Sequence, residues 1–246
     1  MGWDVVCSRA KGQDLRQPAP TRVARTRRFH PRAEPRHNRP MPYRLLIFDF
    51  DGTLADTFAR FKAAVPGMIA RHRLNPVSEA EMEALRGAHG REVMARFGVR
   101  WWQLPVIAAD MRRRMAKDAH TVSLFPGVTE ALDALHAKGV KMAVVSSNAE
   151  GVVRAVLADR QALISKYACG AGVFGKHAHF RRVLAQTRLA PADVIAIGDE
   201  LRDLDAARQV GLAFGAVSWG YTKAEALCPK ADHAFHRPAD WVELCD

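Results

Sequence analysis

The chain has 246 residues, of which 48% are hydrophobic and 26% charged, as is typical of a globular protein with one core, or with one core and a smaller inserted unit. No apolar run approaches the ~20 residues that a membrane-spanning helix needs, so we expect no membrane-embedded protein. The formal net charge of +11 would favour a nucleic-acid-binding protein if it were spread evenly, which it is not.

Much of the positive charge lies in residues 1–40, which hold ten Lys or Arg against three Asp or Glu, together with five prolines. This stretch has no sustained apolar periodicity and cannot bury enough surface to offset its chain entropy, so we predict a disordered tail. Met41 directly precedes the first predicted strand, and we expect translation to start there. A basic arm that contacts RNA or anionic lipid is the alternative. The remaining residues sum to +4, so we expect no nucleic-acid partner.

Cysteine usage indicates a compartment. The four cysteines, at positions 7, 169, 228 and 245, share no spacing typical of a metal site and suggest no disulfide framework. Disulfides are rare where thiols are kept reduced, so this pattern favours a cytoplasmic protein.

The first predicted strand ends in two acids. Leu45 to Phe48 form an apolar run long enough for one buried strand, and Asp49, Asp51 and Gly52 follow it. Two acids at the end of a buried strand cost free energy unless a charge compensates them, and a divalent cation is the natural compensator. Ligands of parallel α/β sheets bind outside the carboxyl ends of the strands, which is where these residues fall. A plain strand-to-loop turn is the alternative.

Residues 56–120 show helical periodicity only, and we interpret them as a helical insertion. Ser78 and Glu81 form a capping-box signature for the second helix, and Pro66 is expected to kink or split the first. The predicted helices span 57–73, 78–85, 92–97 and 104–119.

Two features of the insertion bear on function. Arg86 lies between two predicted helices, in a loop that could close over the site and contact a substrate; ordinary surface exposure is the alternative. Trp101 and Trp102 are expected to pack inside the insertion rather than to act as a stacking platform.

Strands and helices alternate in the rest of the chain, which implies a parallel sheet with right-handed crossovers. The fold class is therefore α/β, a doubly wound parallel sheet with an inserted all-helical unit. The predicted strands span 140–146, 194–197 and 213–217. The predicted helices span 128–138, 149–160, 177–189 and 202–210, with another starting near 223.

Four polar clusters follow the predicted strands or precede a helix. They are Asp49 with Asp51, then Ser146-Ser147-Asn148, then Lys176, then Gly198-Asp199-Glu200-Leu201-Arg202-Asp203. In that order they resemble the four motifs of the haloacid dehalogenase superfamily of hydrolases, with D-F-D-G-T-L-A-D-T and G-D-x-x-x-D carrying most of the resemblance. The chain is most similar to the phosphoglycolate phosphatase-like branch, through L-F-P-G-V-T-E-A-L, A-A-R-Q-V-G and V-S-W-G-Y.

The resemblance covers residues 41–236 and implies two domains. Residues 41–55 and 121–246 would form the α/β hydrolase core, and residues 56–120 the helical cap. The dehalogenases proper lack an acid two residues after the nucleophile, so the presence of Asp51 favours phosphate ester hydrolysis over carbon–halogen cleavage.

The chemistry of phosphoryl transfer suggests a role for each cluster. Asp49 would be the nucleophile that forms an aspartyl-phosphate. Asp51 would protonate the leaving alkoxide and then take a proton from the attacking water. Ser146 would donate to a phosphate oxygen, and Lys176 would place a positive charge beside Asp49 and the phosphate. Weaker candidates for phosphate binding are the backbone N–H groups of Gly52, Ser147 and Asn148.

Mg²⁺ suits a site made of oxygen ligands with several waters. Its expected ligands are Asp49, the backbone carbonyl of Asp51 and Asp199, with Asp203 holding a metal-bound water. Glu200 stands where members of the branch often carry Ser or Thr. Both an outward-facing Glu200 and a shift in the ligand assignment stay open.

Residues 170–177, G-A-G-V-F-G-K-H, offer a rival interpretation because they match G-x-G-x-x-G and G-x-x-x-x-G-K. His177 stands where a phosphate-binding loop needs Ser or Thr. Lys166 and Tyr167 interrupt the apolar run 162–169, so no strong strand is expected before the loop. We therefore expect these glycines to let the backbone bring Lys176 into the site.

The sequence thus predicts a Mg²⁺-dependent phosphatase that acts on a small phosphorylated metabolite, as a monomer or homodimer. A phosphotransferase or phosphomutase on the same scaffold is one alternative, and a non-catalytic binding protein is another. Phosphoglycolate as the substrate is implied by the resemblance alone.

Overall fold

The computed structural model describes residues 43–117, 121–170 and 175–245. The predicted disordered tail, Met41 and residues 171–174 of the glycine-rich loop lie outside the described residues. No helix in the described part of the chain is long and apolar enough to cross a bilayer.

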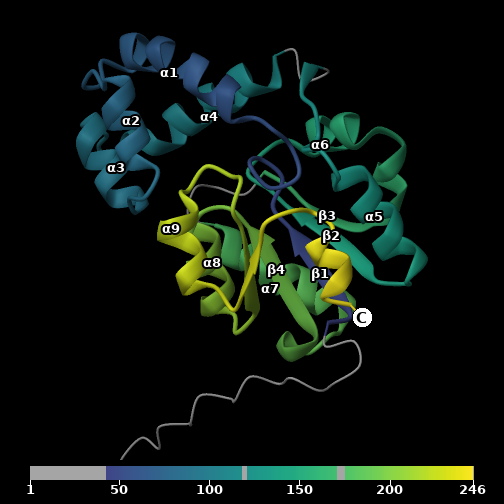
Figure 1. The fold of residues 1–246 in the computed structure, drawn as a ribbon. Helices are drawn as coiled ribbons and strands as arrows, with labels where there is room; N and C mark the ends of the chain where they lie inside the picture. The colour runs from purple at the N-terminus through teal and green to yellow at the C-terminus, as the bar shows by residue number, and fades with distance from the viewer. Residues whose placement is uncertain (1–42, 118–120, 171–174, 246) are drawn as a thin grey trace, which may run out of the picture. The chain divides into compact units, whose positions relative to one another are not determined.

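A six-stranded parallel sheet organises the described residues (Figure 1). Its strand order is β3-β2-β1-β4-β5-β6, and β1 lies between β2 and β4, with Phe48 opposite both Val144 and Ile197. Because the strands are parallel, their carboxyl ends meet at one edge of the sheet. The strands are β1 Leu45–Phe48, β2 Lys141–Val145, β3 Ile164–Ala168, β4 Val194–Gly198, β5 Ala213–Val217 and β6 His233–Phe235.

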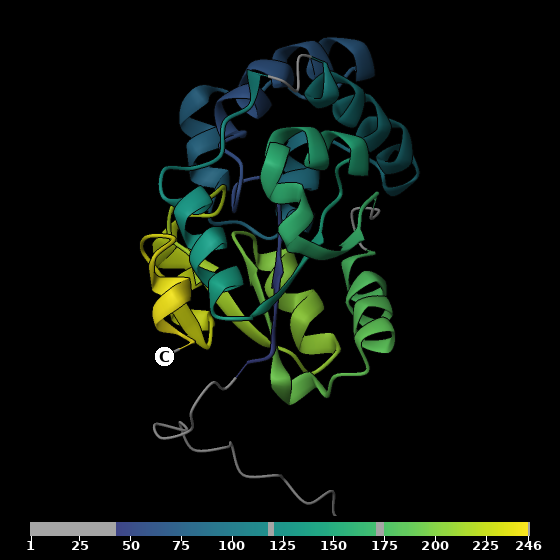
Figure 2. The same cartoon turned by 90° about the vertical axis from the view of Figure 1, so that its right-hand side faces the viewer.

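Helices pack on both faces of the sheet (Figures 1 and 2), as the predicted doubly wound fold requires. Alternate residues of β1 face opposite ways: Leu46 and Phe48 belong to one buried cluster and Leu45 and Ile47 to the other. The first face is covered by α5 Val128–Ala137, α6 Glu150–Leu157 and α10 Asp240–Glu243. The second face is covered by α7 Lys176–Thr187, α8 Leu201–Gln209 and α9 Ala224–Leu227.

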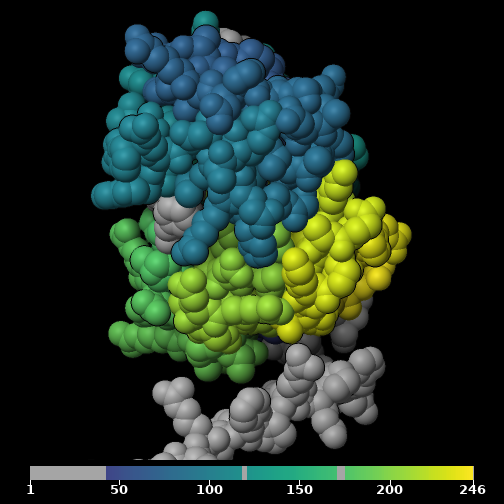
Figure 3. All heavy atoms as spheres, turned by 90° about the vertical axis from the view of Figure 1, so that its left-hand side faces the viewer, coloured from purple at the N-terminus to yellow at the C-terminus, as the bar shows by residue number. Residues whose placement is uncertain are grey.

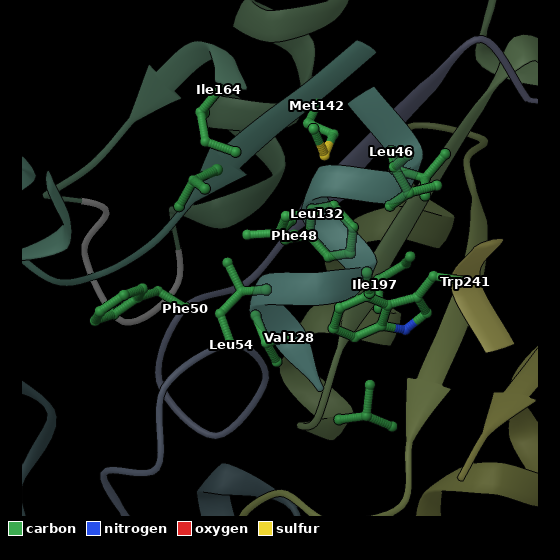
Figure 4. Packing of buried hydrophobic residues seen from close by; sticks show 14 of the residues in the cluster. Leu46, Phe48, Phe50, Leu54, Val128, Leu132, Met142, Ile164, Ile197 and Trp241 are labelled. Carbon is green, nitrogen blue, oxygen red and sulfur yellow. The ribbon is translucent and has the colours of Figure 1, made fainter. Parts of the chain in front are cut away.

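The first face has an aromatic centre. The Phe48 ring lies 4.9 Å from the Trp241 ring, centroid to centroid, and both side chains are fully buried (Figure 4). Phe50 and Leu54, which follow β1 directly, are buried in the same cluster. The loop that carries Asp49 and Asp51 is therefore anchored in the core on either side of its acids.

Two strands were not predicted, β3 and β6, and the expectation of no strand within 162–169 is wrong. Both strands lie at the edges of the sheet, where polar side chains find partners without being fully buried. In β3 the Ser165 hydroxyl donates to Met142 O at 2.7 Å and the Tyr167 hydroxyl donates to Gln161 O at 2.8 Å. Ser165 and Tyr167 thus have hydrogen-bond partners within the strand and its neighbours.

Four helices that follow β1 and precede α5 form a helical insertion, defined here as residues 58–116 (Figure 1). The expected capping box is present, since Glu81 N donates to Ser78 Oγ at 3.2 Å and Ser78 N donates to Glu81 Oε2 at 2.8 Å. Pro66 does not split the first helix, which is continuous across it. The helices are α1 Phe58–His72, α2 Glu79–Leu85, α3 Gly90–Phe97 and α4 Leu104–Ala116.

An ionic contact joins α1 to α4. The Asp110 side chain is buried and lies 3.0 Å from His72 Nε2, with the guanidinium groups of Arg71, Arg113 and Arg114 each 3.4 Å from its carboxylate. The hydrogen bond from His72 holds the pKa of Asp110 below its ordinary value. The insertion therefore relies on a charged contact in addition to its few buried apolar residues.

The expected packing of Trp101 and Trp102 inside the insertion is wrong. Trp101 is 75% exposed and Trp102 is 55% exposed. The two rings pack edge to face on each other, with centroids 5.8 Å apart, and the Arg100 guanidinium lies 5.4 Å from the Trp102 ring. They occupy a short 3-10 turn, Trp101–Gln103, before α4, and their contacts with each other and with Arg100 lie on the surface.

Candidate active site

The loop after β1 turns back on itself. Asp49 N donates to Ile197 O at 2.8 Å, which continues the pairing with β4, and Ala55 N then donates to Phe50 O at 2.9 Å. Gly52 has φ +77°, a conformation that residues with a Cβ rarely adopt, and a Cβ there would collide with the Asp199 and Tyr221 side chains. Glycine is therefore required where this loop passes the end of β4.

Lys176 links two buried carboxylates. Its Nζ lies 2.6 Å from Asp49 Oδ2 and 2.6 Å from Asp203 Oδ1, and all three side chains are buried. Burial opposes the charge of Lys176, but Asp203 and Asp49 raise its pKa above the ordinary value. Burial raises the pKa of Asp49 to about 7, although Lys176 acts in the opposite direction. The structure thus brings together three of the four predicted clusters.

Asp199 is held by the protein on both oxygens. Its Oδ1 accepts from Thr53 Oγ1 at 3.0 Å, and its Oδ2 accepts from Tyr221 N at 2.7 Å. It is fully buried, and this burial raises its pKa well above the ordinary value. Asp199 therefore joins the loop after β1 to the segment after β5.

Glu200 lies closer to the other acids than an outward-facing residue would. Single carboxylate oxygens of Asp49, Glu200 and Asp203 lie within 4.8 Å of one another. Arg202 Nε donates to Glu200 Oε2 at 2.5 Å, and Glu200 N donates to Asp203 Oδ2 at 3.3 Å. Among the side chains of the described residues, this trio forms an acidic cluster that could hold a metal ion.

The donor set fits a hard cation. Carboxylate oxygens are the ligands that Mg²⁺ takes in proteins. Burial raises the pKa values of Asp49 and Asp199 although Lys176 and Arg202 lower that of Asp49, so ionising both acids costs free energy at this edge of the sheet. A divalent cation beside these acids would complete the compensation.

The segment after β2 reaches toward Asp51. Ser146 is fully buried and its Oγ accepts from Asn148 N at 2.9 Å, which leaves its own O–H to donate elsewhere. Asn148 Nδ2 lies 3.4 and 3.5 Å from the two Asp51 oxygens. Two of the backbone N–H groups expected to bind phosphate are already bonded within the protein. Asn148 N donates to Ser146 Oγ, and Gly52 N donates to Ala55 O at 2.9 Å.

Asp51 has a second polar neighbour. The Thr57 side chain lies near the Asp51 carboxylate, and the Thr57 hydroxyl lies 2.9 Å from the Tyr221 hydroxyl. Burial raises the pKa of Asp51 above its ordinary value, and the nearby Thr57 hydroxyl opposes this rise. The raised pKa favours the protonated form that an acid catalyst needs.

Arg86 contacts protein groups rather than open space. Its Nε donates to Tyr221 O at 2.8 Å and its Nη2 to Gly220 O at 2.9 Å. Its Nη1 donates to the Glu83 carboxylate at 3.0 Å, and the guanidinium lies 4.6 Å from the Phe58 ring. Arg86 therefore joins the insertion to the segment after β5, where Figure 3 shows the two regions meeting.

Sequence reasoning missed Thr57, Arg202 and Tyr221 as members of the site. Tyr221 follows β5, and the rule that loops after parallel strands line the site would have indicated it. Arg202 lies inside the recognised G-D-x-x-x-D motif but at a variable position. Thr57 carries no local signal, since a Thr before a helix is ordinarily read as an N-cap.

The parallel sheet and the acidic cluster at its carboxyl edge define an α/β enzyme. The haloacid dehalogenase-like hydrolase family matches residues 46–217, which is more than half of the chain, so the chain belongs to that family. Within it the chain is a phosphatase-like enzyme.

Individual relatives agree with this family. The chain is 31% identical to the phosphoglycolate phosphatase of Synechococcus elongatus, over 80% of this chain and 95% of that protein. It is also 30% identical to the tyrosine-protein kinase PtkA of Mycobacterium tuberculosis, over 74% of this chain and 65% of that protein. A haloacid dehalogenase-like hydrolase of Streptococcus pneumoniae shares the fold, with a TM-score of 0.67, 19% identity and coverage of 83% of this chain and 99% of that one.

Proposed function

We propose that the chain is a Mg²⁺-dependent phosphatase that hydrolyses a small phosphate monoester through an aspartyl-phosphate on Asp49. The observation that carries this proposal is the buried contact of Asp49 with Lys176 at the end of β1, with Asp51 two residues further along. The relatives named phosphoglycolate phosphatase support 2-phosphoglycolate as the first substrate to test.

In the first step an Asp49 oxygen attacks phosphorus while the P–O bond to the leaving group breaks. Asp51 transfers its proton to the departing alkoxide oxygen, and its raised pKa supports this role. The Lys176 ammonium and the Ser146 hydroxyl attract the phosphate oxygens. Ser147 N–H is the remaining backbone candidate, while Arg86 is left out because its three nitrogens already donate to protein acceptors.

In the second step water attacks phosphorus and the bond to Asp49 breaks. Asp51, now ionised, accepts the proton of that water, so the enzyme returns to its starting state. Asp49, the Asp51 carbonyl, Asp203 and either Glu200 or Asp199 would hold Mg²⁺. Bound there, Mg²⁺ would neutralise charge on the phosphate oxygens.

The helical insertion would act as the cap of this enzyme, with residues 56–120 as the cap and residues 41–55 and 121–246 as the core. Its contact through Arg86 with Gly220 and Tyr221, beside Asp199, supports this division. Closure over the site would exclude bulk water from the reaction.

A phosphotransferase is the second candidate, because a protein named as a kinase is as similar to this chain as some of the named phosphatases are. The same aspartyl-phosphate would then pass its phosphoryl group to an acceptor hydroxyl instead of water. Release of inorganic phosphate without an added acceptor favours the phosphatase.

Phosphate release from 2-phosphoglycolate, other alkyl phosphates and p-nitrophenyl phosphate tests the proposal, in the presence of Mg²⁺ and of a chelator. We expect Mg²⁺-dependent release that Asp49→Asn abolishes while Asp205→Asn, an exposed acid on α8, leaves it intact. The absence of release from every ester by folded, Mg²⁺-saturated protein would overturn the proposal.

A further inference from the structure

Two positively charged side chains contact the acidic trio of Asp49, Glu200 and Asp203, and they differ in burial. Lys176 Nζ lies 2.6 Å from both Asp49 and Asp203, and the Lys176 side chain is buried. Arg202 pairs with the third acid: its Nε donates to Glu200 Oε2 at 2.5 Å, and its Nη2 contacts the same oxygen. The Arg202 side chain is 38% exposed. The trio therefore has one buried cationic partner and one that borders solvent.

The start of α8 holds Glu200 at the solvent-exposed side of the trio. Glu200 directly precedes the helix, and the side chain of Leu201, which follows it, is buried. Glu200 N donates to Asp203 Oδ2 at 3.3 Å, which ties the backbone of one acid to the carboxylate of another. The Glu200 side chain is 26% exposed, against 5% for Asp49 and 2% for Asp203. Glu200 is therefore the member of the trio that a cation in solution can reach most readily.

The contact of Arg202 with Glu200 can be exchanged at low cost. An ion pair that water can reach contributes little, because the separated charges are solvated again. Lys176 has no such alternative, since moving it away would leave two buried carboxylates without their cation. A divalent cation that binds beside the trio can therefore replace Arg202 at Glu200 while Lys176 stays in place.

Glu200 also differs from Asp199, the other acid that could complete the site. Both oxygens of Asp199 accept from the protein, one from Thr53 Oγ1 at 3.0 Å and one from Tyr221 N at 2.7 Å. Both contacts of Arg202 fall on a single Glu200 oxygen, Oε2, so Oε1 lies outside that pair. Glu200 can therefore turn toward a cation by giving up its pair with Arg202, whereas Asp199 could turn only by giving up two hydrogen bonds.

We propose that Glu200 is a ligand of the divalent cation and that Arg202 competes with the cation for it. Mg²⁺ at this edge of the sheet comes from the proposed function, on which this inference rests. Arg202 thereby lowers the affinity of the site. Because a guanidinium stays charged at every working pH, the outcome of the competition depends on the concentration of Mg²⁺. The fraction of loaded enzyme would then follow the Mg²⁺ supply over a range that Arg202 sets.

Binding of Mg²⁺ to chelator-treated protein without substrate tests the competition, with isothermal titration calorimetry as the readout. Glu200→Gln keeps the size of the side chain and removes its charge, so we expect the affinity for Mg²⁺ to fall about tenfold or more. Arg202→Met removes the competitor, so we expect the affinity to rise about fivefold. Both side chains border solvent, so neither substitution should disturb folding. Unchanged affinity in either variant would overturn the inference.

The double variant separates competition from the general effect of a nearby charge. If Arg202 acts through Glu200, Arg202→Met should raise the affinity less than about twofold once Glu200→Gln is already present. An equally large rise in that background would show that Arg202 acts on the cation through its charge alone. Competition for Glu200 would then be ruled out.

Two variants on α8 serve as matched controls, because they change the net charge in the same way but lie outside the contacts of the trio. Asp205→Asn removes an exposed acid, and Arg208→Met removes an exposed arginine that donates to Lys230 O. Both should bind Mg²⁺ as the wild type does. A control that shifts the affinity as much as its counterpart would overturn the inference, since net charge alone would then explain both shifts.

The two proposals can fail separately. The Mg²⁺ concentration for half-maximal phosphate release should rise in Glu200→Gln and fall in Arg202→Met, as the affinities do. A wild-type protein that neither binds Mg²⁺ nor releases phosphate contradicts the proposed function. A wild type that does both, beside a Glu200→Gln variant of unchanged affinity, contradicts only the role of Glu200.

Discussion

The core and the helical insertion hold charge in different ways. The core buries Asp49, Lys176, Asp199 and Asp203 at one edge of the sheet, within contact distance of opposite charges or donors. Residues 56–117 carry twelve Lys or Arg against six Asp or Glu, and most of these are partly or fully exposed. The core thus fixes the reacting groups rigidly, while the insertion is held by contacts that can form and break at lower cost.

In the proposed enzyme, the core would position the reacting groups and the insertion would open and close over them. Groups that must not move lie on strands and helix starts whose neighbours are fully buried. In the insertion, α2 and α3 contain no fully buried residue, and Arg86 is one of its hydrogen-bonded links to the core. Variants in the two regions should therefore differ in kind as well as in size.

Lys176→Met should give the largest effect. We expect kcat to fall about 100-fold or more, because a preorganised positive charge beside the phosphate is lost. The free energy of unfolding should fall by about 3–5 kcal/mol, since Asp49 and Asp203 would be buried without their cation. Steady-state kinetics and denaturant unfolding measure both, with Lys166→Met on the edge strand β3 as the matched control. An active and fully stable Lys176→Met protein would contradict the role of the contacts of Lys176 with Asp49 and Asp203.

Arg86→Met should have an intermediate effect that is confined to docking. Loss of the hydrogen bonds to Gly220 O and Tyr221 O should lower kcat about five- to tenfold for every ester, with little change in the melting temperature of the core. Hydrogen exchange of residues 220–223 should increase in the variant. Arg100→Met, which removes an exposed arginine beside Trp102, is the control and should have no effect. An unchanged kcat for every ester would contradict a role of Arg86 in docking the insertion.

Much of the core could be predicted from the sequence, because a buried parallel strand is an unbroken apolar run. A charged residue directly after such a run is easily recognised. This holds for β1, β4 and β5, and for the acids that follow β1 and β4. It fails for β3 and β6, whose edge positions tolerate polar residues such as Lys166. Strand order and the reach of Lys176 to both acids come from packing and not from any local pattern.

The links between regions could not be predicted at all. Arg86 and Tyr221 are 135 positions apart in the sequence, and nothing near either residue indicates the other. Thr57 illustrates the same limit, since its local pattern predicts a helix cap and tertiary contacts turn its hydroxyl toward Tyr221. Local rules describe what a residue can do, and packing decides which partner it meets.

The pH dependence of stability should distinguish the two regions by its sign. In the core the pKa of Asp49 is raised from 3.8 to about 7, so its contribution is fully present below about pH 4 and is lost as the pH rises through about 7. In the insertion the Ser78 backbone and Arg96 lower the pKa of Glu81 from 4.5 to about 2, so its contribution is present above about pH 4.5 and is lost as the pH falls through about 2.

Metal-free protein should therefore become more stable as the pH falls from about 8 to 5, by roughly 2–3 kcal/mol from Asp49, and less stable again under stronger acid. Denaturant unfolding in chelator measures this. Asp49→Asn should flatten the rise and leave the acid limb, whereas Glu81→Gln should reduce only the acid limb. Mg²⁺ should also flatten the rise, because a bound cation stabilises the ionised form of Asp49. The expectation is contradicted if the stability curves of wild type and Asp49→Asn run parallel between pH 5 and 8. The negative charge of the core would then be compensated without a metal. The two regions would in that case differ in burial alone.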